Sequence, residues 1–168
     1  SVEYSLGRED DFVTERVVFC NPGTEAYPWM SWWNAAVPSA PDTEFHFPDG
    51  RVLAHSSRID TIDWNTEGPS READINEMTG YFWMSKNINS FGAWTPSLGV
   101  GLYHTADPSV TPGIKLWSYG VGDDREWAML STAKREPYIE IQGGPISDQS
   151  IKVQLLPGER HWHTEFWI

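Results

Sequence analysis

The stretch Tyr138–Gln142 places a carboxylate and an amide on one face of an expected β-strand. Side chains alternate along a strand, so Ile139 and Ile141 point one way, whereas Glu140 and Gln142 point the other. The β-branched pair predicts a face that packs on a core. A Gly-Gly-Pro sequence then ends the strand. A carboxylate held on a rigid strand can act as a general acid or base, and a neighbouring amide can hold a hydroxyl group.

The same alternation also fits a glutamate that only points into water from an open sheet face. A catalytic role favours an apolar wall that moves the pKa of Glu140 toward neutrality. The chain contains ten tryptophans, and tryptophan can build such a wall. Indole rings fill sandwich cores, but they also stack on apolar ring faces while the N–H donates to a hydroxyl. We therefore expect most tryptophans in the core and a few around a carbohydrate ligand.

Two histidines and a lysine extend this set of candidates. His55 ends the expected strand Arg51–His55, where it would complement Glu140 as an acid or would bind loop carbonyl groups. His104 is a similar candidate for substrate binding. Lys115 and Trp117 share one face of another expected strand, where they would contact a hydroxyl or an acidic sugar. The alternative for Lys115 is a side chain that lies along aromatic rings to reach water.

Further candidate binding residues are consecutive: Trp32, Trp33 and Asn34. Neighbouring residues in a strand face opposite sides of the sheet, so the two indoles point in opposite directions. One of them is therefore expected in the core. The other, with Asn34 beside it, is expected to border the ligand.

The charge composition argues against several classes of partner. Lysine and arginine number 12 against 24 acidic residues, which gives a formal net charge of −12. Nucleic acids and anionic membranes require basic patches, so we expect neither as a partner. The chain has one cysteine, and the pattern of His161, His163 and Glu165 on one strand face lacks further ligands. We expect no metal and no cofactor.

Turn-forming residues indicate the fold class. The chain has 12 prolines and 14 glycines, spread between short runs of strand character. Helical signals are confined to short pieces such as Arg71–Met78. This pattern predicts an all-β antiparallel sandwich, with residues 1–168 as a single domain or the C-terminal part of one.

Four segments and their order resemble the aldose 1-epimerases, or galactose mutarotases. They are Trp29–Ala35, Gly113–Gly120, Tyr138–Gln142 and the Leu-Pro-Gly-Glu at Leu156–Glu159, followed by an aromatic terminal strand. The resemblance is closer to a relative of unknown function that is often found beside tetratricopeptide repeats. That relative combines Trp-Trp-Asn-Ala, Lys-Leu-Trp and Tyr-Ile-Glu-Ile-Gln segments, as this chain does.

The resemblance implies a galactose-mutarotase-like β-supersandwich with a sugar cleft on one concave sheet, and it places Glu140 at the catalytic glutamate. Met30 occupies the position of the family's acid histidine, and a thioether cannot transfer a proton. Complete sandwiches of this type exceed roughly 200–250 residues. The resemblance therefore implies a chain that corresponds to the C-terminal part, with a separate N-terminal piece or chain as an expected partner.

Three hypotheses follow from these observations. In the first, the domain binds a sugar in an aromatic-lined cleft and carries out acid–base chemistry near the anomeric carbon through Glu140. In the second, it is a non-catalytic carbohydrate-binding or accessory module, which Met30 favours. In the third, the sandwich is purely structural and has no affinity for sugars.

Overall fold

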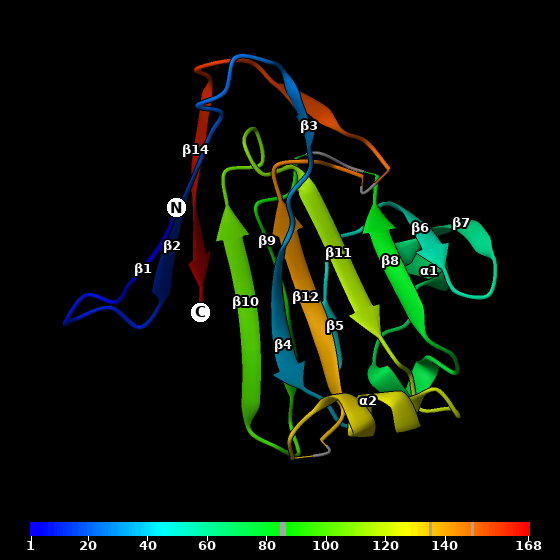
Figure 1. Cartoon of the computed structure of the whole chain (residues 1–168). Helices are drawn as coiled ribbons and strands as arrows, with labels where there is room; N and C mark the ends of the chain where they lie inside the picture. Colours follow the sequence, from blue (N-terminus) through cyan, green and yellow to red (C-terminus); the bar gives the residue numbers. More distant parts are fainter. Residues whose placement is uncertain (85–86, 135, 149) are drawn as a thin grey trace.

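A computed structural model of the chain describes residues 1–84, 87–134, 136–148 and 150–168. Within these residues two six-stranded antiparallel sheets stack face to face (Figure 1). The first sheet has the spatial order β1 (Val2–Ser5), β2 (Val13–Cys20), β14 (Arg160–Trp167), β10 (Val100–Ala106), β9 (Ser90–Thr95) and β5 (Glu44–His46). The second has the order β4 (Trp33–Pro38), β12 (Tyr138–Gly144), β11 (Gly113–Ser118), β8 (Thr79–Trp83), β6 (Arg51–His55) and β7 (Ile59–Asp63). The predicted all-β antiparallel sandwich is confirmed.

Short elements connect the strands. A two-stranded ribbon of β3 (Tyr27–Trp29) and β13 (Val153–Leu155) lies at one end of the sandwich (Figure 1). The helical pieces are α1 (Trp64–Glu67), the 3₁₀ turn η1 (Glu72–Asp74) and α2 (Arg125–Ser131). In the part of the chain that the structure describes, no helix has the length and apolar character needed to cross a bilayer.

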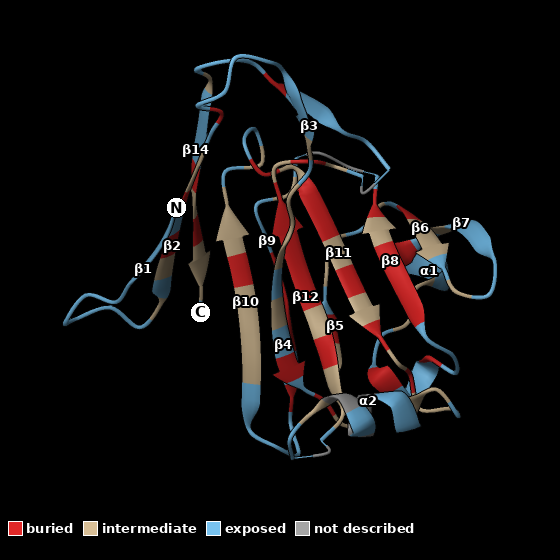
Figure 2. Ribbon diagram, in the orientation of Figure 1, coloured by how far each residue is buried: buried red, intermediate tan, exposed pale blue. Residues whose placement is uncertain are grey.

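The core lies between the inner faces of the two sheets (Figure 2). On the second sheet, Ile139, Ile141 and Leu116 are fully buried. Phe91 and Ala93 of β9 join the same cluster from the first sheet. Because Ile139 and Ile141 point inward, the alternation of β12 turns Glu140 and Gln142 toward the outer face. The predicted division of this strand into an apolar and a polar face is confirmed.

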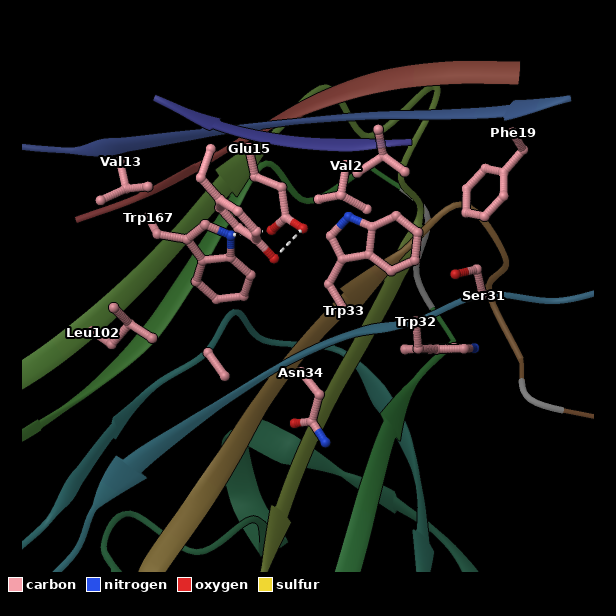
Figure 3. Close-up of a pocket in the computed structure, with 13 residues that line it drawn as sticks. Val2, Val13, Glu15, Phe19, Ser31, Trp32, Trp33, Asn34, Leu102 and Trp167 are labelled. Carbon is pink, nitrogen blue, oxygen red and sulfur yellow. Dashed lines mark hydrogen bonds between the residues drawn. The ribbon is translucent and has the colours of Figure 1, made fainter. Parts of the chain in front are cut away.

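The first sheet extends beyond the second at one side of the sandwich, where β14, β2 and β1 lie past β10 (Figure 1). At this side β4 is the edge strand of the second sheet and pairs with β12 within the described residues. A groove of about 540 Å³ separates β4 from the protruding strands (Figure 3). Its apolar lining includes Val2, Val13, Val17, Phe19, Trp33, Leu102 and Trp167.

Buried ionisable side chains of the first sheet lie close to this groove. His104 and Glu165, both fully buried, form a pair with 2.7 Å between Nε2 and Oε2. His163 lies 3.5 Å from the other oxygen of Glu165. Burial, aided by the nearby His104, lowers the pKa of His163 to about 4. Because its pKa is that low, His163 is neutral at pH 7. Burial also raises the pKa of Glu165, although the neighbouring His104 acts in the opposite direction.

Candidate functional site

The outer face of the second sheet brings together most of the predicted site residues. We call this surface the polar face and define it by two rows that cross the strands. The strand register places Asn34, Gln142, Lys115 and Phe82 in one row, and Ala36, Glu140, Trp117, Gly80 and His55 in the next. Adjacent strands are about 4.8 Å apart, so neighbours within a row can contact one ligand.

Glu140 lies at the centre of the polar face and is held by two amides. Asn34 Nδ2 donates to Glu140 Oε2 over 2.8 Å, and Gln142 Nε2 donates to the same oxygen over 2.9 Å. Both donors are neutral, so they orient the carboxylate without cancelling its charge. Both of these hydrogen bonds are made to Oε2.

A hollow of about 440 Å³ borders the half-buried Glu140. Strands β4 and β12 form its floor through Ala36, Pro38, Tyr138 and Glu140. The segment before β12 forms its wall, with Thr132, Ala133, Lys134, Glu136 and Pro137. The carboxylate is therefore neither sealed in the core nor isolated in bulk solvent.

Aromatic rings stand beside Glu140 on the same face. Trp117 is directly opposite Glu140 in the pairing of β11 with β12. It packs edge-to-face on Tyr119 at 4.4 Å between ring centroids, and Tyr138 lies 6.3 Å away. Tyr119 and Tyr138 are themselves 5.6 Å apart. Such a cluster fixes the indole and offers a partly exposed ring to the apolar face of a sugar.

Lys115 adds a positive charge to the polar face. It is opposite Gln142 in the register, and its Nζ lies 4.8 Å from the centroid of the Phe82 ring. Burial lowers the pKa of Lys115, while the negative charge of Glu140 acts in the opposite direction. The ammonium group is thus partly desolvated, which strengthens any hydrogen bond that it donates to a ligand.

A second hollow, of about 390 Å³, lies across Trp117 from Glu140. Its lining residues are His55, Ser56, Ser57, Glu77, Met78, Gly80, Phe82, Lys115, Trp117 and Asp124. Four of them come from β8 or β11, and the others from the end of β6 and from loops. His55 is exposed at this rim. Three strand spacings, roughly 14 Å, separate its row position from that of Glu140.

Trp33 begins β4 and Trp32 precedes it, and both line the groove beside β4. Trp33 projects into the groove beside β4 and contacts His163 and Phe19, at 4.9 and 5.6 Å between centroids. Figure 3 shows Asn34 pointing away from Trp33, toward the polar face. Trp32 packs edge-to-face on Phe82, with 6.4 Å between ring centroids. Trp32 therefore adjoins the polar face, and Trp33 does not.

His104 also lies away from the polar face, contrary to the expectation that it binds substrate. It is on the first sheet, 1% exposed, and paired with Glu165. Its ring lies beneath β12, because a Cβ atom added to Gly143 would come within 2.8 Å of His104 Nε2. The backbone of β12 thus separates His104 from any ligand on the outer face.

Sequence reasoning missed the acidic residues of the second hollow, Glu77 and Asp124. Both lie in loops, where no strand alternation indicates which way a side chain points. The signal that could have found Asp124 is its place just before α2, a helix that the sequence analysis did not predict. Within the described ranges of the chain, no group of three or more His, Cys, Asp or Glu side chains is placed to hold a metal ion.

The fold and the strand register define a class of protein, the galactose-mutarotase-like sandwich. A putative aldose 1-epimerase from Escherichia coli K12 superposes with a TM-score of 0.68 at 12% identity, and the match covers 99% of this chain and 58% of the epimerase. A galactose mutarotase related enzyme from Lactobacillus acidophilus superposes with a TM-score of 0.65 at 14% identity, covering 99% and 59%. At these identities the likeness establishes the fold.

The chain belongs to the DUF5107 family, a domain of unknown function whose family model matches residues 1–168. A TPR-domain containing protein from Parabacteroides distasonis ATCC 8503 is 68% identical, with a TM-score of 0.95. That match covers 99% of this chain and 29% of the TPR-domain protein. The chain thus spans less than a third of that protein and about three fifths of the two epimerase-like proteins. The resemblance inferred from the sequence is confirmed.

Proposed function

We propose that the polar face binds carbohydrate, with Glu140 as the central acceptor of sugar hydroxyls. One observation carries this proposal: Asn34 and Gln142 both donate hydrogen bonds to one oxygen of Glu140. This carboxylate borders a hollow, and Trp117 is its partner on the next strand. Charge-assisted hydrogen bonds to a fixed carboxylate are strong and directional. Trp117 provides the stacking surface that neutral sugars require in addition to hydrogen bonds.

The lining combines acceptors, donors and apolar surface in the proportions that a polyol needs. Glu140 accepts, Lys115 and the amides donate, and Trp117 and Trp32 supply the apolar contacts. An anionic or cationic ligand would be attracted by one of Glu140 and Lys115 and repelled by the other, so its charge would add little to the binding free energy. A neutral saccharide can use both groups, because each hydroxyl donates and accepts.

A second candidate function is acid–base catalysis near the anomeric carbon, with Glu140 as the base. It is supported by the carboxylate of Glu140, which the two amides hold in a fixed position on β12. A proton donor on the other side of the sugar is also required. His55 is three strands from Glu140, so the two residues do not reach the same ring, and Met30 cannot donate a proton. The geometry therefore favours binding without turnover.

The experiment is a calorimetric titration with a panel of neutral saccharides, using wild-type protein, Glu140→Ala and Glu140→Gln. We expect Glu140→Ala to weaken binding about tenfold or more, because it removes a charged acceptor. Glu9→Gln is the control, since Glu9 is an exposed turn residue far from the polar face in sequence and sheet order. Equal affinity of wild-type protein and Glu140→Ala for every bound saccharide would refute the proposal.

Catalysis is tested separately with the same variants. Proton NMR follows the exchange between α and β anomers of a freshly dissolved aldose. An enzyme would accelerate this exchange, and Glu140→Gln would abolish the acceleration while retaining saccharide binding. The binding hypothesis predicts that wild-type protein and Glu140→Gln leave the anomerisation rate equal to that in buffer.

We also propose that further polypeptide pairs with the open edge of β4 and fills the groove beside it. The proposal is supported by the apolar lining of that groove, by Val2 and Val13, which are 55% and 37% exposed, and by the larger size of the matched proteins. A strand added there would alternate between the groove and the polar face. Its outward side chains would adjoin Asn34 and Ala36.

The probe for this pairing is the part of the Parabacteroides distasonis protein outside the matched segment, co-expressed with this chain. Co-purification that Val13→Asp abolishes and Val153→Asp preserves would support pairing at the groove, since Val153 lies on the separate β3–β13 ribbon. No co-purification, or equal loss with both variants, would contradict it. Self-association of this chain through β4 would also contradict it.

A further inference from the structure

We propose that the second hollow is a second saccharide subsite, so that the polar face takes a neutral oligosaccharide rather than a monosaccharide. This inference rests on the proposed carbohydrate-binding function and adds the class of ligand. The ligand would cross the strands from the hollow at Glu140, over Trp117, to the hollow bordered by His55 and Asp124.

The row that contains Glu140 crosses the sheet from one hollow to the other, and we call this row the trough. Its successive members are Ala36, Glu140, Trp117, Gly80 and His55. Glu140 lines the first hollow, and Trp117, its neighbour in the row, lines the second. About 14 Å separates the row positions of Glu140 and His55, and a single sugar ring does not reach across three strands.

Gly80 opens the floor of the trough between Trp117 and His55. A Cβ atom at this position would lie 3.3 Å from the Phe82 ring and 3.4 Å from both the Lys115 side chain and the Trp117 indole. A side chain at this position would therefore press on the Phe82 ring and touch Lys115 and Trp117, all three of which line the hollow. Because the backbone of Gly80 is extended β-strand, this glycine is not needed for a turn.

The rim of the second hollow carries polar groups that suit sugar hydroxyls. Asp124 Oδ2 accepts a hydrogen bond from the Met78 backbone N–H over 2.9 Å. That bond engages one oxygen of the carboxylate, and Asp124 lines the hollow. Glu77 Oε1 accepts a long hydrogen bond, of 3.4 Å, from Ser57 Oγ. Lys115 also lines this hollow.

These charges also select the ligand. Glu77 and Asp124 would repel the carboxylate of an acidic sugar at one end of the trough, and Glu140 would repel it at the other. Neutral rings meet no such penalty and can donate hydroxyl hydrogens to all three carboxylates. An oligosaccharide of neutral rings thus fits both hollows, with one ring stacked on Trp117 between them.

Calorimetry tests this inference with glucose, galactose and their β-1,4-linked oligomers of two to four rings. We expect at least one series in which the tetramer binds about tenfold more tightly than the monomer, as one further set of hydrogen bonds to charged groups would give. Asp124→Asn and Gly80→Ala are expected to remove most of that gain while leaving monomer affinity within about twofold. Asp123→Asn, an exposed neighbour, is the matched control.

The outcomes separate this inference from the proposed function. If monomers and tetramers bind equally, or if Asp124→Asn and Gly80→Ala leave the tetramer affinity unchanged, the second subsite is refuted, whereas carbohydrate binding at Glu140 stands. If no saccharide binds to wild-type protein, both proposals fail. Circular dichroism and the urea unfolding midpoint of each variant confirm that a loss of affinity is not a loss of fold.

Discussion

A buried glutamate outside the polar face gives the most quantitative prediction of this structure. Glu72, in the 3₁₀ turn η1, is 1% exposed. Ser118 Oγ lies 2.9 Å from each of its carboxylate oxygens. The same Oγ accepts a hydrogen bond from Gly120 N–H, so its own hydrogen is directed to Glu72. Arg125 Nη1 lies 3.4 Å from Glu72 Oε1.

Burial raises the pKa of Glu72 to about 7, and Ser118 and Arg125 only partly oppose this effect. In the unfolded chain the carboxyl group titrates near the ordinary value of 4.5. The folded state therefore holds the proton more tightly, and this stabilisation is fully present below pH 4.5. It is lost as the pH rises through 7. Linkage gives a loss of about 2.5 kcal/mol between pH 5 and pH 8.

The variant Glu72→Gln keeps the size of the side chain and removes its titration. Urea unfolding at several pH values gives the unfolding free energy of the wild type and of the variant. The contributions of the other titrating groups cancel in the difference between the two proteins. Relative to Glu72→Gln, the wild type should lose about 2.5 kcal/mol from pH 5 to pH 8. Glu126→Gln controls for the loss of a charge, because Glu126 is exposed on the nearby α2. Parallel pH profiles for wild type and Glu72→Gln would refute the reasoning.

Three further predictions concern the core and the site. Gly143→Ala should lower the unfolding free energy by about 1–3 kcal/mol, because the new Cβ presses on the buried His104; an unchanged urea midpoint would contradict this packing. Because the pKa of His163 is lowered to about 4, its contribution to the unfolding free energy is fully present above pH 6.5 and is lost as the pH falls through 4. His163→Phe should therefore lose less stability than wild type between pH 6.5 and pH 4 in urea titrations, and an equal loss would show that His163 is accessible. Asn34→Ala removes a 2.8 Å donor to Glu140 and should weaken saccharide binding about three- to tenfold in calorimetry; unchanged affinity would exclude an orienting role.

The strand alternation allowed much of the polar face to be predicted from the sequence. Ile139 and Ile141 indicated which side of β12 meets the core, and this fixed the direction of Glu140 and Gln142. Lys115 and Trp117 followed the same rule on β11, and the register places them opposite Gln142 and Glu140. That these two strands are neighbours could be inferred only from the family resemblance, since pairing is a long-range contact.

Other features depend on contacts that no local pattern reveals. His104 follows a tyrosine in a strand of mixed character, and its burial depends on Glu165, 61 residues away in the sequence. Helix α2 has no sustained apolar repeat to predict it, and Arg125 at its start reaches Glu72, far along the chain. The second hollow is built partly from loops, whose side-chain directions are set by bonds such as that between Met78 and Asp124.

The side-chain amides of Asn34 and Gln142 offer the most direct test of the central claim, that a saccharide binds at the carboxylate they hold. A ¹⁵N NMR titration with the tightest-binding oligosaccharide follows their NH₂ signals together with the indole N–H of Trp117. We expect all three signals to shift with one common affinity, while the amide of Asn65 on α1 stays unchanged. Signals of Asn34 and Gln142 that remain fixed at saturating ligand would contradict it.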